Sequence, residues 1–360
     1  MSWDIKNLVW SSKIAILSVN MKYLKRLTHS ELSKILNPRP KEIKFGEQIV
    51  LLSNSTPIYD QLLNLDVGYV IFGIKEAVGV FANCGNHGTE NAWDAAIKVL
   101  VNTQANPHTH ANKVLILGCL EFEAFQEKIN TLDQSNKKDL KKARKIVQKI
   151  DAEVTFLMHQ IVSAGKIPIV IGGGHNNAYG NIKGTSLALK KPINVINFDA
   201  HHDFRDEEGR HSGNGFSYAF AEGFLKRYFI FGMHENYVSD TILNTLKKLK
   251  NIQYNTFEAI AIRKTLDLKH EMNAALEHLG DAAFGLEIDC DAIKNTPSSA
   301  KTPSGFSAEQ ARQFVDFFGS CENASYLHIC EAAPTKETET QVGKLITYLI
   351  SDFIRAHAND

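Results

Sequence analysis

The amino-acid sequence predicts an α/β protein built on a mainly parallel sheet. Short apolar segments of strand length recur along the chain, and segments with apolar residues at helical spacing separate several of them. A strand, a crossover helix and the next parallel strand form the usual unit of such a pattern. We therefore expect helices to cover both faces of a central sheet.

Each expected element is a segment with one clear periodicity. Apolar runs of strand length predict strands, in chain order, at 67–74, 113–118, 167–172, 194–198, 227–232, 283–288 and 326–331. Apolar residues at every third or fourth position predict helices at 92–101, 137–164, 308–318 and 341–356. The lysine-rich beginning of segment 137–164 is interpreted as a solvated helix face without a function.

The chain has 360 residues, a length that allows two domains or one large α/β domain. Residues 1–64 show mixed helical and turn signals, interrupted by Asn37-Pro-Arg-Pro40. We interpret them as an N-terminal extension that packs on the main domain or on a neighbouring subunit. Residues 65–360 contain the alternating strands and helices and are expected to form the main domain.

The composition excludes several classes of partner. Lys and Arg together number 40, as do Asp and Glu, so no positive charge excess indicates a nucleic acid or an anionic membrane. The apolar runs are too short to span a bilayer, and the first residues lack the pattern of a signal peptide. The five cysteines are scattered and odd in number, which favours reduced thiols in a cytoplasmic protein.

The segment 197–205 carries the clearest chemical signal. It follows an apolar run and presents Asp199, His201 and Asp203 at alternating positions. Side chains alternate between the two faces of an extended segment, so these three are expected to point the same way. Two carboxylates and an imidazole suit a divalent metal ion. The alternative is a polar loop that is merely acidic.

Further polar residues follow other expected strands, namely His175, the pair Asp289 and Asp291, and Glu331. Ligands of open α/β sheets bind outside the carboxyl ends of the strands, where all these residues fall. Taken singly, His175 could be a turn residue, the aspartates could cap a helix, and Glu331 could pair with a surface lysine. Together, the histidines and aspartates are a ligand inventory for two divalent ions, and their oxygen-rich character favours manganese over structural zinc.

Three motifs in this order, Gly172-Gly-Gly-His175, Asn197-Phe-Asp-Ala-His-His-Asp203 and Ile288-Asp-Cys-Asp291, resemble the signatures of the ureohydrolase family, which contains arginase, agmatinase and formimidoylglutamase. The resemblance extends from about residue 67 to the C-terminus. It implies a ureohydrolase catalytic domain with a three-layer α/β/α sandwich and an eight-stranded, mainly parallel sheet. It also implies a homo-oligomer, because relatives form trimers or hexamers.

The same resemblance implies two Mn²⁺ ions per subunit. One ion would be held by His175, Asp199, Asp203 and Asp289. The other would be held by His201, Asp199, Asp289 and Asp291, so that Asp199 and Asp289 bridge the pair.

The implied substrate is a small amidine or guanidine. Glu331, within Ile329-Cys-Glu-Ala-Ala-Pro334, matches the family glutamate that binds the cationic end of the substrate. Such a carboxylate can orient the planar cation through charge-assisted hydrogen bonds. Asp291 is the expected proton carrier when the tetrahedral intermediate collapses, as in relatives.

Local features favour formimidoylglutamase within the family. Gly174 precedes the first histidine, where arginases and agmatinases usually have aspartate. Phe204-Arg205 is similar to the Leu-Arg that ends this motif in formimidoylglutamases. Ser212-Gly-Asn-Gly-Phe216 has phenylalanine where arginase has a proton-shuttling histidine. The expected reaction converts N-formimidoyl-L-glutamate and water to L-glutamate and formamide, a step of histidine degradation.

The substrate contacts beyond Glu331 are expected in the same region. Arg205 or Arg210 could receive a substrate carboxylate, and we include Asn214 as a further contact. The alternative for both arginines is a surface charge. His211 is a hypothetical proton shuttle, because the arginase histidine is missing.

Other residues depart from the family pattern and leave the specificity open: Asn176 replaces the usual Ser or Glu, Glu287 stands where Ser or Thr is common, and Lys294-Asn-Thr-Pro297 replaces an Asp-Pro.

The first alternative to a formimidoylglutamase is an agmatinase, an arginase or another guanidino-compound hydrolase that releases urea. The second is a catalytically silent member with a regulatory or scaffolding role. The complete ligand set argues against the silent reading.

Overall fold

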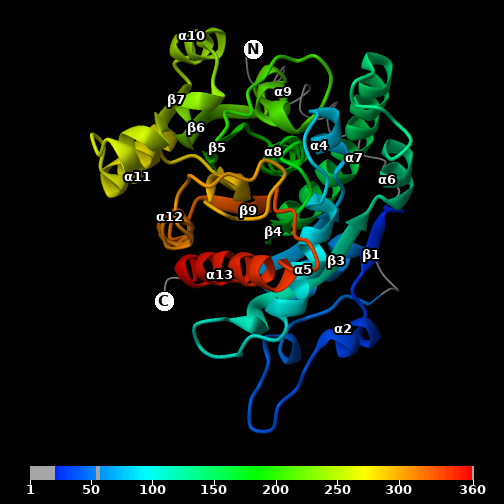
Figure 1. Ribbon diagram of the computed structural model, residues 1–360. Helices are drawn as coiled ribbons and strands as arrows, with labels where there is room; N and C mark the ends of the chain where they lie inside the picture. Colours follow the sequence, from blue (N-terminus) through cyan, green and yellow to red (C-terminus); the bar gives the residue numbers. More distant parts are fainter. Residues whose placement is uncertain (1–20, 54–56, 359–360) are drawn as a thin grey trace, which may run out of the picture.

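The protein is described by a computed structural model covering residues 21–53 and 57–358. Their strands form one nine-stranded sheet in the order β1-β3-β2-β4-β9-β8-β5-β6-β7 (Figure 1). The strands are β1 (Leu24–Arg26), β2 (Tyr69–Lys75), β3 (Val114–Glu121), β4 (Ile167–Ile171), β5 (Ile193–Phe198), β6 (Leu225–Met233), β7 (Ile252–Thr256), β8 (Phe284–Asp289) and β9 (Ala324–Cys330).

The predicted fold class is confirmed, with one difference in the sheet. Strands β2 to β9 all run parallel to one another. The ninth strand, β1, is the antiparallel edge strand and pairs with β3, with Leu24 opposite Leu120. Part of the predicted N-terminal extension thus adds a strand to the sheet, while residues 1–20 of that extension lie outside the described residues. Strands β1 and β7 were not predicted.

Helices lie between consecutive strands, and the last helix, α13, follows the final strand. They are α2 (His29–Ile35), α3 (Ile58–Asn64), α4 (Val78–Ala82), α5 (Ala92–Leu100), α6 (Glu123–Ile129), α7 (Lys137–Ser163), α8 (Asn177–Leu189), α9 (Gly215–Ala221), α10 (Asp240–Lys248), α11 (Leu268–Leu279), α12 (Ala308–Gly319) and α13 (Glu339–His357). The four predicted helices correspond to α5, α7, α12 and α13. None of the helices in the described part of the chain has the length and apolarity needed to cross a bilayer.

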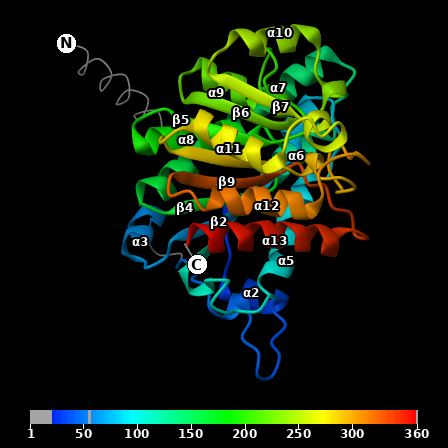
Figure 2. The ribbon, with the colours of Figure 1, turned by 90° about the vertical axis from the view of Figure 1, so that its left-hand side faces the viewer.

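The sheet separates two hydrophobic cores, as a three-layer fold requires. Alternate residues of β2 point to opposite faces, so that Ile71 belongs to one core and Val70 to the other. Helices α5, α12 and α13 cover the first face, and Figure 2 shows α12 and α13 side by side. Helices α7 and α8 pack together on the second face. Because both faces are covered, the free rim at the carboxyl ends of the strands is the place for a site.

Candidate active site

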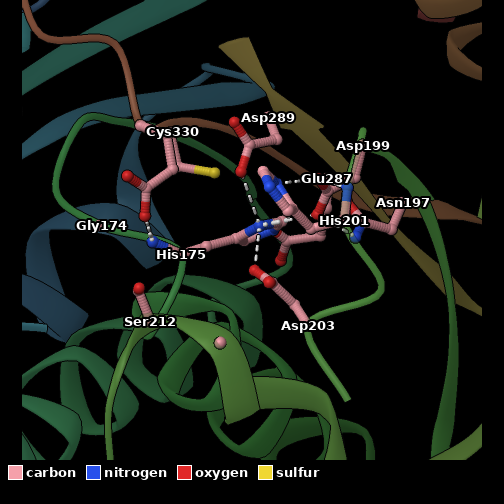
Figure 3. Close-up of polar contacts among 12 residues, drawn as sticks. Gly174, His175, Asn197, Asp199, His201, Asp203, Ser212, Glu287, Asp289 and Cys330 are labelled. Atoms are coloured by element: carbon pink, nitrogen blue, oxygen red, sulfur yellow. Dashed lines mark hydrogen bonds and ion pairs between the residues drawn. The ribbon is translucent and has the colours of Figure 1, made fainter. Parts of the chain in front are cut away.

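The structure brings all six predicted metal ligands together at this rim, and Figure 3 labels each of them except Asp291. They come from the ends of three strands that are far apart in the sequence. The loop after β4 carries one, the segment after β5 carries three, and the end of β8 carries two: His175, Asp199, His201, Asp203, Asp289 and Asp291.

The first group surrounds the fully buried His175. Its Nδ1 atom lies 2.9 Å from Asp203 Oδ2, 3.1 Å from Asp289 Oδ2 and 3.3 Å from Asp199 Oδ2. A single N–H proton cannot satisfy three carboxylate oxygens at once. A divalent cation accepts the imidazole lone pair and all three carboxylates. The donor set therefore fits a metal ion better than it fits a protonated histidine.

The second group contains Asp199, His201 and Asp291. His201 Nδ1 lies 2.9 Å from Asp291 Oδ2 and 3.6 Å from Asp199 Oδ1. Asp291 Oδ1 is buried without a hydrogen-bond partner. Asp199 belongs to both groups, as the resemblance implies for a bridging ligand. Asp289, the other implied bridge, belongs to the first group only.

The electrostatics of the site attract positive charge. Burial lowers the pKa of His201, but the charges and hydrogen bonds of Asp291 and Asp199 outweigh burial and raise this pKa far above its usual value. Burial and the neighbouring charge of Asp199 raise the pKa of Asp203 to about 6. Carboxylates this close repel one another unless a cation lies between them.

The backbone of the site has unusual conformations. Asp203 and Glu331 have φ values of 42° and 59°, in the left-handed region that non-glycine residues rarely adopt.

The buried carboxylate of Glu76 holds the loop after β4, because its Oε1 accepts hydrogen bonds from Gly174 N at 2.9 Å and Asn177 Nδ2 at 2.7 Å. Glu76 was not predicted from the sequence.

Glu287, one of the departures from the family pattern, contacts the far side of His175. Its Oε2 lies 3.5 Å from His175 Nε2 and 2.5 Å from His328 Nδ1, and its Oε1 accepts a hydrogen bond from Tyr326 Oη at 2.7 Å. A proton on Nε2, at the edge of the ring that faces Glu287, leaves the lone pair of Nδ1 directed at the three aspartates. His328 Nε2 lies 3.3 Å from the carbonyl oxygen of Gly172, so both ring nitrogens of His328 face oxygen atoms of the protein.

A cavity of about 520 Å³ opens above the two groups. Its walls include two of the predicted substrate contacts, Arg205 and Glu331. Glu331 is held in place, because its Oε1 accepts a hydrogen bond from His175 N at 2.6 Å and its Oε2 accepts one from Ser299 Oγ. Ser299 also lines the cavity and was not predicted.

The structure does not place Arg210 and Asn214 in the cavity, contrary to their prediction as substrate contacts. Arg210 is 2% exposed, and its Nε lies 3.0 Å from Asp151 Oδ2 on helix α7. It also donates to Asn214 Oδ1 at 2.5 Å and to Asn176 O at 2.8 Å. The reason is that a buried Asp151 needs a cation beside it, and Arg210 supplies that cation.

His211 is also buried, behind the cavity wall. Its Nδ1 accepts a hydrogen bond from Gly213 N at 3.2 Å, and its Nε2 lies 3.2 Å from Glu208 Oε1. Burial, together with the nearby arginines, lowers the pKa of His211 to about 3, so the ring is neutral at pH 7. His211 does not line the cavity itself, but its partner Glu208 does.

Replacing Arg210 with methionine should therefore destabilise the fold. Burial raises the pKa of Asp151 to about 6, although Arg210 opposes this shift. A carboxyl group whose pKa is higher in the folded state than in the unfolded state destabilises the fold when it ionises. Stability therefore falls as the pH rises from the unfolded-state pKa, about 4, to the raised pKa of the folded state. Without Arg210 the pKa rises further, so we expect a loss of about 3–5 kcal/mol in the free energy of unfolding at pH 8 and a smaller loss at pH 5.

Urea unfolding at the two pH values measures this difference. The control is Arg205→Met, whose half-exposed side chain pairs with Glu208 at 3.4 Å. That change should cost less than about 1 kcal/mol. Equal and small losses in both variants would contradict the structural role of Arg210.

Comparisons with known proteins identify a family and a fold. The family model of the arginase family matches residues 87–355. The formimidoylglutamase of Streptococcus gordonii is 26% identical over 239 residues, which span 64% of this chain and 66% of that protein, just under two thirds. The formimidoylglutamase of Streptococcus pyogenes serotype M12 is 24% identical over 291 residues, or 78% of this chain and 82% of that protein.

Solved structures show the same fold. Formimidoylglutamase from Bacillus subtilis superposes with a TM-score of 0.67 at 15% identity, covering 88% of this chain and 94% of that one. Formiminoglutamase from Trypanosoma cruzi with Mn²⁺ gives 0.66 at 19% identity, covering 88% and 99%. A hypothetical agmatinase from Burkholderia thailandensis gives 0.63 at 16% identity, covering 82% and 88%.

The family match covers most of the chain and includes every residue of the two acidic groups. The chain therefore belongs to the arginase family and is a hydrolase of carbon–nitrogen bonds in linear amidines.

Proposed function

We propose that the protein is a two-manganese hydrolase that converts N-formimidoyl-L-glutamate and water to L-glutamate and formamide. The observation that carries this proposal is the pair of acidic groups that share Asp199 beneath a cavity containing Glu331 and Arg205. The names of the curated relatives support the choice of substrate.

The residues would divide the metal binding as follows. His175, Asp203 and Asp289 would hold one ion, His201 and Asp291 the other, and Asp199 would contact both. Ions so placed would supply a nucleophile at neutral pH by lowering the pKa of water.

The remaining residues would bind and orient the substrate. Glu331 is buried at the cavity wall and can accept charge-assisted hydrogen bonds from the planar amidinium, since each carboxylate oxygen has a second lone pair free. Asp291 Oδ1, buried and without a hydrogen-bond partner, can carry a proton to the leaving nitrogen. The nitrogen that leaves becomes the amino group of glutamate.

Arg205 would bind a carboxylate of the substrate. It lines the cavity, its side chain is 50% exposed, and its Nη1 donates to Asn83 Oδ1 at 2.7 Å. This hydrogen bond orients the guanidinium beside the cavity. A half-exposed arginine can exchange its contact with Glu208 for a substrate carboxylate.

One observation favours a second candidate, a hydrolase of a guanidino compound that carries a second cation. Asp206 and Glu208 line the same wall as Arg205, and Glu208 already pairs with it. Such a wall would accept a substrate ammonium group, as in agmatine, and the product would then be urea.

The assembly and compartment are also proposed by resemblance. We propose a homo-oligomer that works in the cytoplasm, where thiols stay reduced. All five cysteines are free, which suits a reducing compartment. Light scattering of the purified protein measures the number of copies.

The test of the proposed reaction combines metal counting with product analysis. The protein is stripped with a chelator, reloaded with Mn²⁺ and offered N-formimidoyl-L-glutamate, agmatine, arginine and guanidinobutyrate. We expect about two manganese ions per chain, by mass spectrometry, and release of formamide. Urea from a guanidino substrate, with no formamide, would replace the first candidate by the second. Failure to take up manganese would contradict both.

A further inference from the structure

Four aromatic rings form a stacked column that ends at His201. The ring of His201 stacks on Tyr237 with centroids 4.9 Å apart and planes 15° apart. Tyr237 stacks in turn on His234 at 5.4 Å and 9°, and His234 stacks on Phe257 at 4.8 Å and 24°. We call these four residues the ring column.

The inner end of the ring column is anchored in the protein core. Phe257 is 4% exposed and meets the fully buried Phe306 edge to face at 5.0 Å. His234 is 5% exposed. The rings beneath Tyr237 are therefore fixed by packing, and Tyr237, which follows β6, is held against a rigid support.

The two histidines of the site are supported differently. His175 is fully buried, and its ring is fixed by Glu287 on one edge and by Phe216 in an edge-to-face contact at 5.0 Å. The side chain of His201 is 30% exposed. Its ring is held by Asp291 and Asp199 on one edge and by Tyr237 on one face. The more exposed histidine thus relies on a stacking contact.

We propose that Tyr237 is a positioning residue that fixes the ring of His201 for metal binding. The inference rests on the proposed two-ion site. A phenol ring parallel to the imidazole restricts its rotation, and the ring of an imidazole that shares charge with a cation is attracted to an aromatic face. Outer-shell partners that orient a metal-binding histidine by hydrogen bonds typically contribute a factor of about 10–100 to metal affinity, and for a stacking partner we expect the lower end of that range.

Tyr237 also lines the cavity, which suggests a competing role for its hydroxyl group in binding the substrate. The two roles need different atoms. Stacking needs the ring and survives replacement by phenylalanine, whereas a hydrogen bond to the substrate needs the hydroxyl group.

The experiment compares Tyr237→Ala and Tyr237→Phe with the wild-type protein. Metal-free protein is titrated with Mn²⁺ in a calorimeter, and kcat and KM are measured separately on the manganese-loaded protein. The control is Tyr348→Ala, because Tyr348 is also half-exposed, at 51%, but lies on α13 beneath Arg312. The thermal midpoint of each metal-free variant shows whether the fold is intact.

We expect Tyr237→Ala to weaken one of the two manganese equivalents by about tenfold or more and to leave the other unchanged. Tyr237→Phe and Tyr348→Ala should bind both equivalents as the wild type does. Unchanged affinity in Tyr237→Ala would overturn the proposal, as would an equal loss in Tyr237→Phe, which would assign the effect to the hydroxyl group. A wild-type protein that binds fewer than two equivalents would instead overturn the two-ion site itself.

Discussion

Replacing Asp199 with asparagine should lower turnover by at least about a thousandfold, since losing metal-assisted catalysis costs several kcal/mol of transition-state stabilisation. Asp199 is the residue common to both acidic groups, with Oδ2 3.3 Å from His175 Nδ1 and Oδ1 3.6 Å from His201 Nδ1. An asparagine supplies one neutral oxygen in place of two charged ones. Manganese content should fall below two per chain, as measured by mass spectrometry after removal of excess metal.

The matched control is Asp206→Asn. Asp206 lines the same cavity but is exposed and belongs to neither acidic group. It should keep both ions and lose little activity towards N-formimidoyl-L-glutamate, which carries no ammonium group for Asp206 to bind. An Asp199→Asn protein with two ions and normal turnover would contradict the shared role of Asp199.

Replacing Glu331 with glutamine should lower kcat/KM by about 10- to 100-fold. A hydrogen bond to a charged group contributes about 1.5–3 kcal/mol, and glutamine removes the negative charge that binds the amidinium. Glutamine has nearly the same size, and its carbonyl oxygen can still accept the hydrogen bond from His175 N. Manganese uptake should therefore be unchanged, which separates this variant from Asp199→Asn.

Steady-state kinetics and metal counting on one preparation measure both quantities. Ser299→Ala is a useful companion, because Ser299 donates a hydrogen bond to Glu331 Oε2 but leaves the carboxylate charge in place. Its loss in kcat/KM should be smaller than that of Glu331→Gln. A Glu331→Gln protein with normal kcat/KM would show that this carboxylate does not bind the substrate cation.

The sequence was most informative where a local pattern specifies the structure. Apolar runs identified the central parallel strands, because strands covered on both faces are apolar throughout. The alternation of Asp199, His201 and Asp203 predicted that three metal ligands lie at one rim of the sheet. The ends of β4 and β8 predicted the same rim for the remaining ligands. Ligands of open sheets bind at the carboxyl ends of the strands, and this rule predicted that segments distant in the sequence form one site.

The elements that the sequence did not reveal depend on distant contacts. Strand β1 is three residues long and contains Lys25 and Arg26, and β7 has little apolar character, so neither resembles a buried strand. Arg210 was assigned to a substrate carboxylate, and its actual partner, Asp151, has no local signal because it lies 59 positions earlier in the sequence. The stacking of Tyr237 on His201 has no signal in the local sequence, since it depends on how the segments after β5 and β6 meet in space.

The two-ion site is tested most directly by X-ray diffraction from manganese-soaked crystals at the manganese absorption edge. We expect two anomalous peaks per chain. One should lie among His175, Asp203 and Asp289, the other should lie beside His201 and Asp291, and both should contact Asp199. A single peak, or peaks away from these residues, would contradict the two-ion site.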